Sequence, residues 1–270
     1  MPAEVRRALT IAGSDSGGGA GIQADLKTFS ALGVFGMTAI TAVTVQNTKG
    51  VSGYEELSPE LVGAQIRAVA TDIGVDAAKT GMLASAAIAE AVADAVRDTR
   101  IEKLVVDPVF VSKHGHPLLQ EDAVHVLRSR IVPLAAVVTP NLSEAAGLAG
   151  FEVRTREDMK RAAGAILELG ARGVLLKGGH LEGGRASDLY SDGDCAEWLE
   201  AERIDTPHTH GTGCVLSAAI AAHLAHGEET LDAVSKAKAF VTEAVRGALA
   251  IGEGIGPVNP LGEVWARRRG

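Results

Sequence analysis

The sequence predicts a three-layer α/β fold, with a mostly parallel central sheet and helices on both of its faces. Short apolar runs at residues 104–109, 136–139 and 173–177 have the length and continuity of buried parallel strands. Segments with helical periodicity separate these runs, as the crossovers of a parallel sheet require. The sequence contains no repeat or low-complexity linker that would divide it. We therefore expect one domain spanning residues 1–270.

Composition narrows the classes of function. Hydrophobic residues make up 46% of the 270 residues, which is enough for a substantial core. The formal net charge of −8 argues against nucleic acid as the main partner, although a local phosphate site can still be positive. The two cysteines, Cys195 and Cys214, are too few for a disulfide framework or a cysteine metal cluster. Because no apolar run resembles a signal peptide or a membrane span, we expect a cytoplasmic protein without a membrane partner.

The chain begins with a strand, a glycine-rich loop and a helix. Residues 8–13 form an apolar run, residues 14–21 are rich in glycine, and residues 22–32 are amphipathic. This order is typical of a phosphate or dinucleotide site. However, neither G-x-G-x-x-G nor G-K-[ST] is present, so a strand-to-helix turn that needs glycine for close packing is the alternative. Asp25, one turn into the helix, is on this evidence equally a surface residue or a ligand.

A second strand is expected at residues 37–45, ending in the turn cluster 46–50. Gln46 in this cluster offers two donors and two acceptors, which suits the edge of a heterocycle, although a solvent-facing loop amide is the simpler interpretation. Ser58 and Pro59 predict a helix start, through a cap hydroxyl and a proline at the first helical position. The next expected elements are this helix to about residue 71, a strand at 77–81 and a helix at 84–96.

Polar residues stand where the three central strands end. Asp107 closes the first, Asn141 and Glu144 follow the second, and Lys177 closes the third. Ligands of open parallel sheets bind at the carboxyl ends of the strands. Two carboxylates and one ammonium at that edge suit a magnesium–polyphosphate site, because Mg²⁺ prefers carboxylate and water oxygens and lysine neutralises phosphate. Each acidic residue alone could be a helix cap or a strand-end hydrogen-bond acceptor, and the joint pattern favours the metal site.

The last third of the chain contains local signals for helix ends and a hairpin. Thr155 and Asp158 predict a capped helix start, and Gly170 predicts the end of that helix. An Asp-Gly pair at residues 192–193 predicts a tight turn. The elements expected from these signals and from periodicity are hairpin strands at 187–190 and 195–199 and helices at about 213–225 and 231–251.

A second glycine-spaced turn, at residues 210–213, leads directly into an Ala-rich helix. Such a helix start offers unpaired N–H groups and the positive end of the helix dipole, so it predicts an anion site. Cys214 lies in the first turn, where the pKa of a thiol tends to fall. The alternative interpretation is a tight turn before a core helix with a buried cysteine.

Six motifs stand in order along the chain, at residues 13–28, 41–48, 79–83, 106–109, 139–144 and 209–214. Together they resemble the hydroxymethylpyrimidine/phosphomethylpyrimidine kinases of bacterial thiamine synthesis, and the resemblance covers nearly the whole chain. It implies a ribokinase-like fold, ATP and Mg²⁺, and a homodimer. The implied reaction transfers the γ-phosphate of ATP to the hydroxymethyl group of 4-amino-5-hydroxymethyl-2-methylpyrimidine. A second transfer onto the resulting monophosphate would give the diphosphate.

The resemblance also implies roles for individual residues. Asp25 and Gln46 would read the pyrimidine, and Cys214 would stand where many proteins of this fold carry an aspartate base. The full implied set is Gly13, Asp25, Thr44, Gln46, Met82 and Val109 for the acceptor, Asp107 and Glu144 for magnesium, Lys177, Asp188 and Thr212 for ATP, and Lys177, Gly211, Thr212, Gly213 and Cys214 for catalysis.

Two departures from the family pattern bear on the choice of acceptor. Ser16 stands where proline is usual, and residues 110–115 replace a smaller run that contains methionine. Some relatives phosphorylate pyridoxal, another ring with a hydroxymethyl group, and this is the alternative within the fold. Two alternatives from other classes are a non-catalytic pyrimidine or vitamin sensor, and a cysteine hydrolase that pairs Cys214 with His208 or His210.

Overall fold

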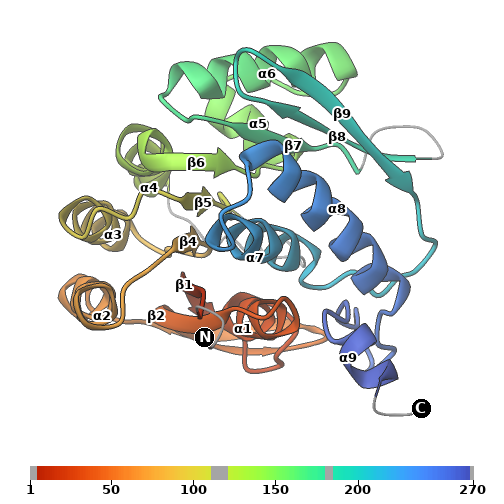
Figure 1. Cartoon of the computed structure of the whole chain (residues 1–270), viewed down its shortest axis with the longest axis horizontal. Helices are drawn as coiled ribbons and strands as arrows, with labels where there is room; N and C mark the ends of the chain where they lie inside the picture. The colour runs from red at the N-terminus through yellow and green to blue at the C-terminus, as the bar shows by residue number, and fades with distance from the viewer. Residues whose placement is uncertain (1–4, 111–120, 180–184, 268–270) are drawn as a thin grey trace.

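The computed structural model describes residues 5–110, 121–179 and 185–267. A sheet of nine strands forms the middle layer of the described part (Figure 1). The strands are β1 (Arg7–Ser14), β2 (Phe35–Asn47), β3 (Gly50–Glu56), β4 (Ala77–Thr80), β5 (Leu104–Val106), β6 (Ala135–Val138), β7 (Val174–Lys177), β8 (Arg185–Ser191) and β9 (Ala196–Glu202). Their order across the sheet is β3-β2-β1-β4-β5-β6-β7-β8-β9. The strands from β2 to β7 in this order are parallel, whereas β3, β8 and β9 pair antiparallel at the two sides.

Helices cover both faces of the sheet, so the predicted three-layer class is confirmed (Figure 1). The helices are α1 (Gly21–Ala31), α2 (Pro59–Asp72), α3 (Ala86–Asp98), α4 (Glu121–Val126), α5 (Leu142–Ala149), α6 (Arg156–Glu168), α7 (Thr212–Ala225), α8 (Thr230–Arg246) and α9 (Gly262–Ala266), with the short turns η1 (Leu127–Ile131) and η2 (Val132–Leu134). Helices α2 to α6 pack into one apolar cluster with the sheet, and α1, α7 and α8 pack into a second. Among the helices of the described ranges, none is both long and apolar enough to cross a membrane.

Local side-chain chemistry explains several of the element boundaries. The Ser58 hydroxyl accepts a hydrogen bond from Leu61 N at the start of α2, as its cap position predicts. Thr155 and Asp158 form a capping box at the start of α6. Gly193 adopts a φ of +97° in the turn between β8 and β9, where a side chain would be strained. The elements that these signals predicted are present.

Three regions differ from the prediction. Strand β2 continues to Asn47, so Gln46 lies in the strand, where it pairs with Val51, rather than in the predicted turn. The edge strand β3 was missed, because its sequence combines glycine, serine and acidic residues without an apolar alternation. Helix α8 ends at Arg246 rather than at residue 251, because Gly247 follows and the N–H of Leu249 donates to the carbonyl of Pro257 at 2.9 Å. No prediction covered α4, η1, η2 or α9. Of the departure at residues 110–115, only Phe110 lies within the described residues.

The strand order places the candidate site. After β1, the chain adds β2 and β3 on one side of it, and then adds β4 and the remaining strands on the other. The connections therefore diverge at the carboxyl ends of β1 and β4. A crevice at such a reversal is where ligands bind to open parallel sheets.

Candidate active site

A cavity of about 650 Å³ opens at the carboxyl ends of the parallel strands. Its walls come from the ends of β1, β4, β5 and β7, from the glycine loop at residues 15–21 and from the start of α7. All but one of the site residues expected from the sequence line it, the exception being Asp25. The lining members of that set are Gly13, Thr44, Gln46, Met82, Asp107, Val109, Glu144, Lys177, Asp188, Gly211, Thr212, Gly213 and Cys214.

One wall carries a cluster of two carboxylates and one ammonium. Lys177 Nζ lies 3.1 Å from Asp107 Oδ1 and 3.9 Å from Glu144 Oε2. The hydroxyl groups of Thr139 and Ser217 donate to the two oxygens of Asp107. Burial alone would lower the pKa of Lys177, but Asp107 and Glu144 raise it above its usual value. Lys177 is therefore a permanent cation facing the cavity.

Glu144 has two roles in this wall. Its carboxylate accepts from Asn141 N at 2.8 Å, and Asn141 Oδ1 accepts from Glu144 N, so the residue completes a capping box at the start of α5. Its pKa is also raised to about 7, because burial and the neighbouring Asp107 outweigh the attraction of Lys177. The cap interpretation is therefore correct. It is compatible with a ligand role, because the carboxyl group also lines the cavity.

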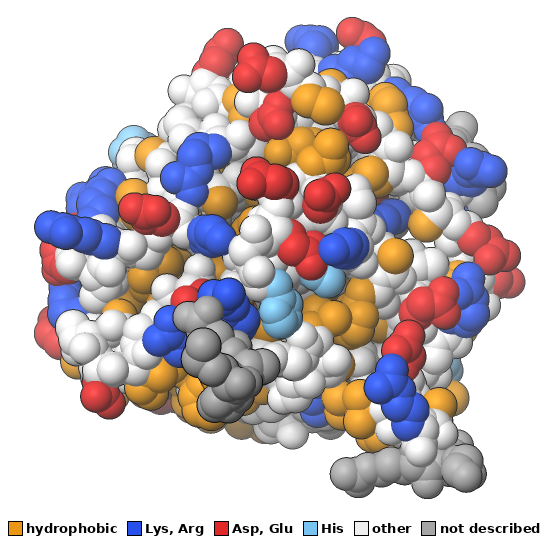
Figure 2. All heavy atoms as spheres, viewed as in Figure 1, with side chains coloured by type: hydrophobic (Ala, Val, Ile, Leu, Met, Phe, Trp, Pro, Cys, Tyr) orange, Lys and Arg blue, Asp and Glu red, His pale blue; other side chains and the backbone are white. Residues whose placement is uncertain are grey.

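The overall surface charge adds little to the attraction of the cavity for an anion. On the face shown in Figure 2, acidic and basic side chains of the described residues are interspersed. The attraction for an anion is therefore local to the cavity, where Lys177 and the start of α7 face the same space. A Cβ added to Gly213 would lie 3.5 Å from Lys177 Nζ.

The start of α7 presents backbone amides to this space. Gly211 is the N-cap, with a φ of +82°, and the first helical hydrogen bond runs from Val215 N to Gly211 O at 2.9 Å. The amide of Thr212 donates to the carbonyl of Thr209 at 3.4 Å, whereas the amides of residues 213–214 precede the first helical bond and lie at the positive end of the helix dipole. The Thr212 hydroxyl donates to the carbonyl of Thr209 at 2.7 Å, which stiffens the turn. The arrangement suits a phosphate group.

Cys214 differs from the expectation for a thiol at a helix start. Burial raises the pKa of Cys214 to about 12, although Lys79 and the N–H of Gly21 act in the opposite direction. Asp25 and Asp107 add to the increase. Desolvation of a thiolate outweighs the helix start here, so the expected low pKa is wrong. The environment is also the opposite of that of an activated nucleophile, which argues against a cysteine hydrolase.

Asp25 is neither a surface residue nor part of the cavity wall. It is fully buried, its carboxylate lies 3.1 and 3.2 Å from Lys79 Nζ, and the hydroxyl of Thr10 donates to it at 2.6 Å. Lys79, at β4, lines the cavity in its place. Lys79 was not predicted as a site residue, because a lysine in a short strand carries no sign of a partner 54 residues away. A direct contact of Asp25 with the pyrimidine stays a prediction.

Both oxygens of the Asp188 carboxylate likewise have partners within the protein. Its Oδ1 accepts from Gly178 N at 2.9 Å, and its Oδ2 lies 2.6 Å from Lys238 Nζ. Lys238 belongs to α8 and also lines the cavity. It was missed because a lysine within a helix is usually solvated. The pair places Lys238 at the same cavity as a second lysine. Any contribution of Asp188 to ATP binding would therefore involve Lys238 as well.

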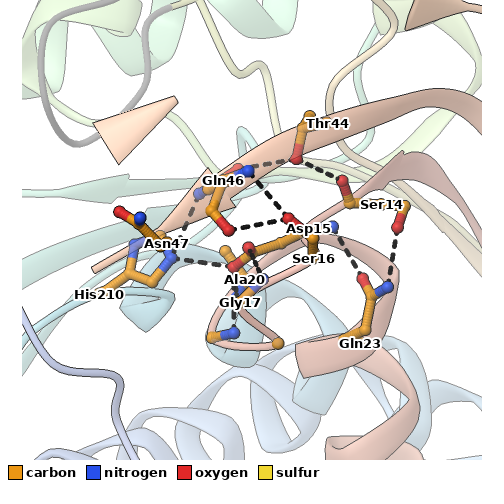
Figure 3. A network of polar contacts seen from close by, with 12 residues as sticks. Ser14, Asp15, Ser16, Gly17, Ala20, Gln23, Thr44, Gln46, Asn47 and His210 are labelled. Atoms are coloured by element: carbon orange, nitrogen blue, oxygen red, sulfur yellow. Dashed lines mark hydrogen bonds and ion pairs between the residues drawn. The ribbon is translucent and has the colours of Figure 1, made fainter. Parts of the chain in front are cut away.

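The opposite wall is a network of polar contacts around Gln46 (Figure 3). The Thr44 hydroxyl donates to Ser14 O at 2.7 Å and lies 3.2 Å from the Gln46 amide. Asp15 and His210 join this network, and the sequence analysis gave neither a place in the acceptor site. The Asp-x-Gly pattern at residues 15–17 was the available signal, since aspartate side chains often bond the backbone two residues on.

The glycine loop and the glycine turn touch each other across the cavity floor. A Cβ on Gly211 would overlap the carbonyl oxygen of Gly19. A Cβ on Gly13 would lie 3.2 Å from Met82 Sδ, which shows how closely the acceptor wall packs. Glycine at residue 211 is therefore required both by its φ of +82° and by this contact.

Comparison with known proteins identifies the family. A family model described as phosphomethylpyrimidine kinase matches residues 15–259. The hydroxymethylpyrimidine/phosphomethylpyrimidine kinase of Streptomyces coelicolor is 54% identical over 251 residues, which are 93% of each chain. A pyridoxal kinase of Bacillus subtilis in complex with ADP superposes with a TM-score of 0.90 at 42% identity, covering 97% of this chain and 99% of that one. A phosphomethylpyrimidine kinase of Clostridium difficile gives a TM-score of 0.80 at 43% identity, covering 90% and 100%. The chain belongs to the phosphomethylpyrimidine kinase family, with the ribokinase-like fold that the resemblance implied.

Proposed function

We propose that this kinase transfers the γ-phosphate of ATP to the hydroxymethyl group of 4-amino-5-hydroxymethyl-2-methylpyrimidine, and then a second phosphate to that product, in thiamine synthesis. The observation that carries the proposal is a single cavity with two unlike walls. One wall holds Lys177, Asp107 and Glu144 beside the start of α7, and the other holds the Gln46 amide. The first wall suits polyphosphate and the second suits a polar ring. The names of the curated relatives support the same reaction.

The residues present fit a magnesium ion. Asp107 and Glu144 share one lysine, so two carboxyl groups lie beside a single ammonium. No group of three or more His, Cys, Asp or Glu side chains placed for a metal is found among the described residues. A site of two carboxylates suits Mg²⁺, which commonly keeps waters and phosphate oxygens as its other ligands. When bound, the ion would offset charge on the ATP phosphates.

The protein's own groups position the reactants and stabilise charge. Lys177 and the amides of residues 213–214 would hold the transferred phosphoryl group, which carries its charge on peripheral oxygens. The acceptor oxygen attacks the γ-phosphorus, the bond to the β–γ bridging oxygen breaks, and ADP leaves with that electron pair. The hydroxyl proton must leave near the transition state. Cys214 on α7 lines the cavity and is the candidate base, and its raised pKa means that it would first have to lose its own proton in the ternary complex.

Three further assignments belong to this proposal. The sequence pattern predicts a single domain over residues 1–270 and a cytoplasmic location, and the family resemblance implies a homodimer. The exposed apolar side chains on β2 and β3, among them Val43, Val45 and Tyr54, support a contact between subunits. Sedimentation equilibrium of the purified protein tests the oligomeric state.

The proposed function is tested by ADP release with each acceptor in turn. We expect hydroxymethylpyrimidine to give a higher kcat/KM than pyridoxal, with two ADP formed per pyrimidine at completion. The likeness to a pyridoxal kinase makes pyridoxal the second candidate. A higher kcat/KM for pyridoxal would transfer the assignment to that ring. ADP release that neither ring stimulates would favour the non-catalytic sensor.

A further inference from the structure

His210 lies where three parts of the acceptor wall meet (Figure 3). Its imidazole Nε2 lies 3.0 Å from Asp15 Oδ2 in the glycine loop and 3.3 Å from the side-chain amide of Gln46 at the end of β2. Its main chain pairs with the segment at residues 256–258 through two hydrogen bonds of 3.1 and 3.0 Å. The imidazole is buried, so these contacts are made away from bulk water. The reaction described above uses Gln46 but leaves Asp15 and His210 without a role.

Asp15 is a carboxylate that can only accept hydrogen bonds. Its Oδ1 accepts from Gly17 N at 2.8 Å, and its Oδ2 accepts from Gly19 N at 3.0 Å and Ala20 N at 2.8 Å. Burial would raise the pKa of Asp15, but the bond to His210 and the backbone amides hold it below its usual value. Since an ionised carboxylate has no proton to give, the His210 Nε2 that faces it must carry one.

The proton on His210 Nε2 determines which atom of the Gln46 side-chain amide can face it. The single proton of His210 Nε2 lies toward Asp15 at 3.0 Å and can be shared with a second oxygen, but a protonated Nε2 cannot accept from an NH₂ group. In the structure Gln46 Nε2 lies 3.3 Å from this nitrogen and Gln46 Oε1 lies 3.2 Å from the Thr44 hydroxyl, so the proton count requires the flipped amide, with its oxygen toward His210. Amide orientation is decided by such counts, because the oxygen and nitrogen have nearly the same shape.

The contact of the Gln46 amide with Thr44 independently requires the same orientation of the amide. Thr44 has one hydroxyl proton, and its contact with Ser14 O at 2.7 Å is shorter than its contact with Gln46 at 3.2 Å. The proton therefore goes to Ser14, and the Thr44 oxygen must accept from Gln46. The amide nitrogen consequently faces Thr44. Both ends require the same orientation, with the oxygen toward His210 and the nitrogen toward Thr44.

We propose that Asp15 and His210 form a positioning pair that fixes the orientation of the Gln46 amide and thereby sets which edge of the acceptor ring is bound. The main chain of Gln46 is held separately, because the Ser16 hydroxyl donates to Gln46 O and accepts from Gln46 N, both at 2.8 Å. Only the side-chain amide is then left to be oriented. Ser16, the departure from the usual proline, supplies this link.

The fixed amide has a consequence for the acceptor, which rests on the proposed function. After its contacts with His210 and Thr44, the amide keeps one N–H and one lone pair for a ligand, in a fixed order. A 4-aminopyrimidine offers a donor beside a ring-nitrogen acceptor. Its 4-oxo analogue offers an acceptor beside a ring N–H, the reverse order. The pair should therefore favour the amino ring, since the oxo ring would match only the reversed amide.

The protonation state of His210 is a direct test that needs no substrate. Two-bond ¹H–¹⁵N correlation spectra of the ligand-free protein at pH 7.5, with His210 assigned through its backbone, distinguish the two neutral tautomers and the imidazolium. We expect Nε2 to carry a proton. A His210 ring with an unprotonated Nε2 overturns the proposal. Because this measurement uses the wild-type protein, it decides the question even if a variant fails to fold.

Kinetics with the two rings test the consequence. In the wild type we expect a preference for the amino ring of about 10⁴-fold in kcat/KM, and in His210→Met a fall of that preference by about tenfold or more, with the KM for ATP within about twofold. His210→Gln returns an N–H donor near the Nε2 position and should recover most of the preference. His208→Met is the matched control, because His208 lies on the same segment and its Nδ1 accepts from Gly256 N. It should leave the preference unchanged.

A merely structural His210 would give another pattern. Lower thermal stability of His210→Met with an unchanged preference between the rings would overturn the proposal, and so would an equal change in His208→Met. A wild type that phosphorylates neither pyrimidine would refute the proposed function. The spectra would still decide whether the pair orients Gln46.

Discussion

Two lysine–aspartate pairs lie at the same edge of the sheet and differ in how far their charged groups are exposed. Lys79 and Asp25 are both completely buried, and Thr10 occupies the remaining side of the carboxylate. In the second pair, Lys177 is 18% exposed, and it shares Asp107 with a further carboxyl group, Glu144. The first pair is closed within the protein. The second leaves a cation and unneutralised carboxyl groups facing the cavity.

The difference shows what separates a structural lysine from a ligand-binding one. Both lysines end or nearly end a short parallel strand, so position in the sheet does not distinguish them. The number of acceptors that share the ammonium and the exposure of the lysine side chain do. Cys214 interacts electrostatically with both pairs, since it contributes to raising the pKa of both lysines. A substitution of Cys214 should therefore affect both lysines.

Breaking the closed pair should have the largest effect. We expect Lys79→Met to lower the free energy of unfolding by about 3–5 kcal/mol, because Asp25 is left buried without its counter-ion. Urea unfolding measures this loss. Adding Asp25→Asn should recover part of it, because the unpaired charge is then removed as well. If Lys79→Met kept its stability and lost only turnover, the closed pair would have to be reassigned to the reaction.

The same substitution in the open pair should act on turnover instead. We expect Lys177→Met to lower kcat by about 10²–10³-fold, the range for losing one group that stabilises the transition state. ADP release with saturating hydroxymethylpyrimidine measures it. The loss of unfolding free energy should be smaller than in Lys79→Met. An equally unstable Lys177→Met with normal turnover per folded molecule would remove the distinction between the pairs.

Cys214, which interacts with both lysines, should show an intermediate effect. We expect Cys214→Ala to lower kcat by about 10²-fold, the lower end of the range for loss of a general base, since the thiol holds its proton in the free enzyme. The raised pKa means that the neutral thiol is favoured in the folded state. Its contribution to stability is therefore complete below pH 9.0 and is lost as the pH rises toward about 12.

Thiol alkylation checks that sign directly. In a Cys195→Ser background, iodoacetamide should modify Cys214 slowly up to pH 9 and faster above it, after correction for the thiolate of a free cysteine. Rapid modification at pH 7 would mean that Lys79 and the helix start dominate over burial. Cys214 would then be a reactive thiol with a lowered pKa, as its position at a helix start predicted.

The smallest effect is expected for the shared carboxyl group. Glu144→Gln should lower kcat by about tenfold at low magnesium, because the carboxyl group is already partly protonated near its pKa of about 7. Glutamine at this position still completes a capping box, so stability should stay close to wild type. Raising magnesium should restore part of the loss. A drop in thermal stability with unchanged magnesium dependence would reduce Glu144 to its cap role.

Local chemistry was predictable from the sequence, whereas long-range pairs were not. The capping box of Thr155 and Asp158 forms within four residues, and the Asp-Gly turn needs only its neighbours. The cavity set was predicted because strand ends meet at one sheet edge and because the motifs resemble a known family. By contrast, Asp15 meets His210 across 195 positions of the chain. No periodicity or spacing reports such a contact.

The prediction for Cys214 failed for a related reason. A helix start lowers the pKa of a thiol, and that feature is visible in the sequence. The burial that outweighs it comes from packing between α1, α7 and the strand ends, which the sequence does not show. The end of α8 was misplaced in the same way, because the partner of Leu249 is the distant Pro257.

The backbone contact between Gly19 and Gly211 limits how this protein can be engineered. Because a methyl group on Gly211 would overlap the Gly19 carbonyl, a mutant library that varies the two loops independently would contain mostly misfolded members. A library aimed at a new acceptor ring should hold these two glycines fixed. It should diversify Met82 and Val109 instead, whose side chains line the cavity without closing a turn. Recombination between relatives should likewise exchange the two loops together, as one inherited unit.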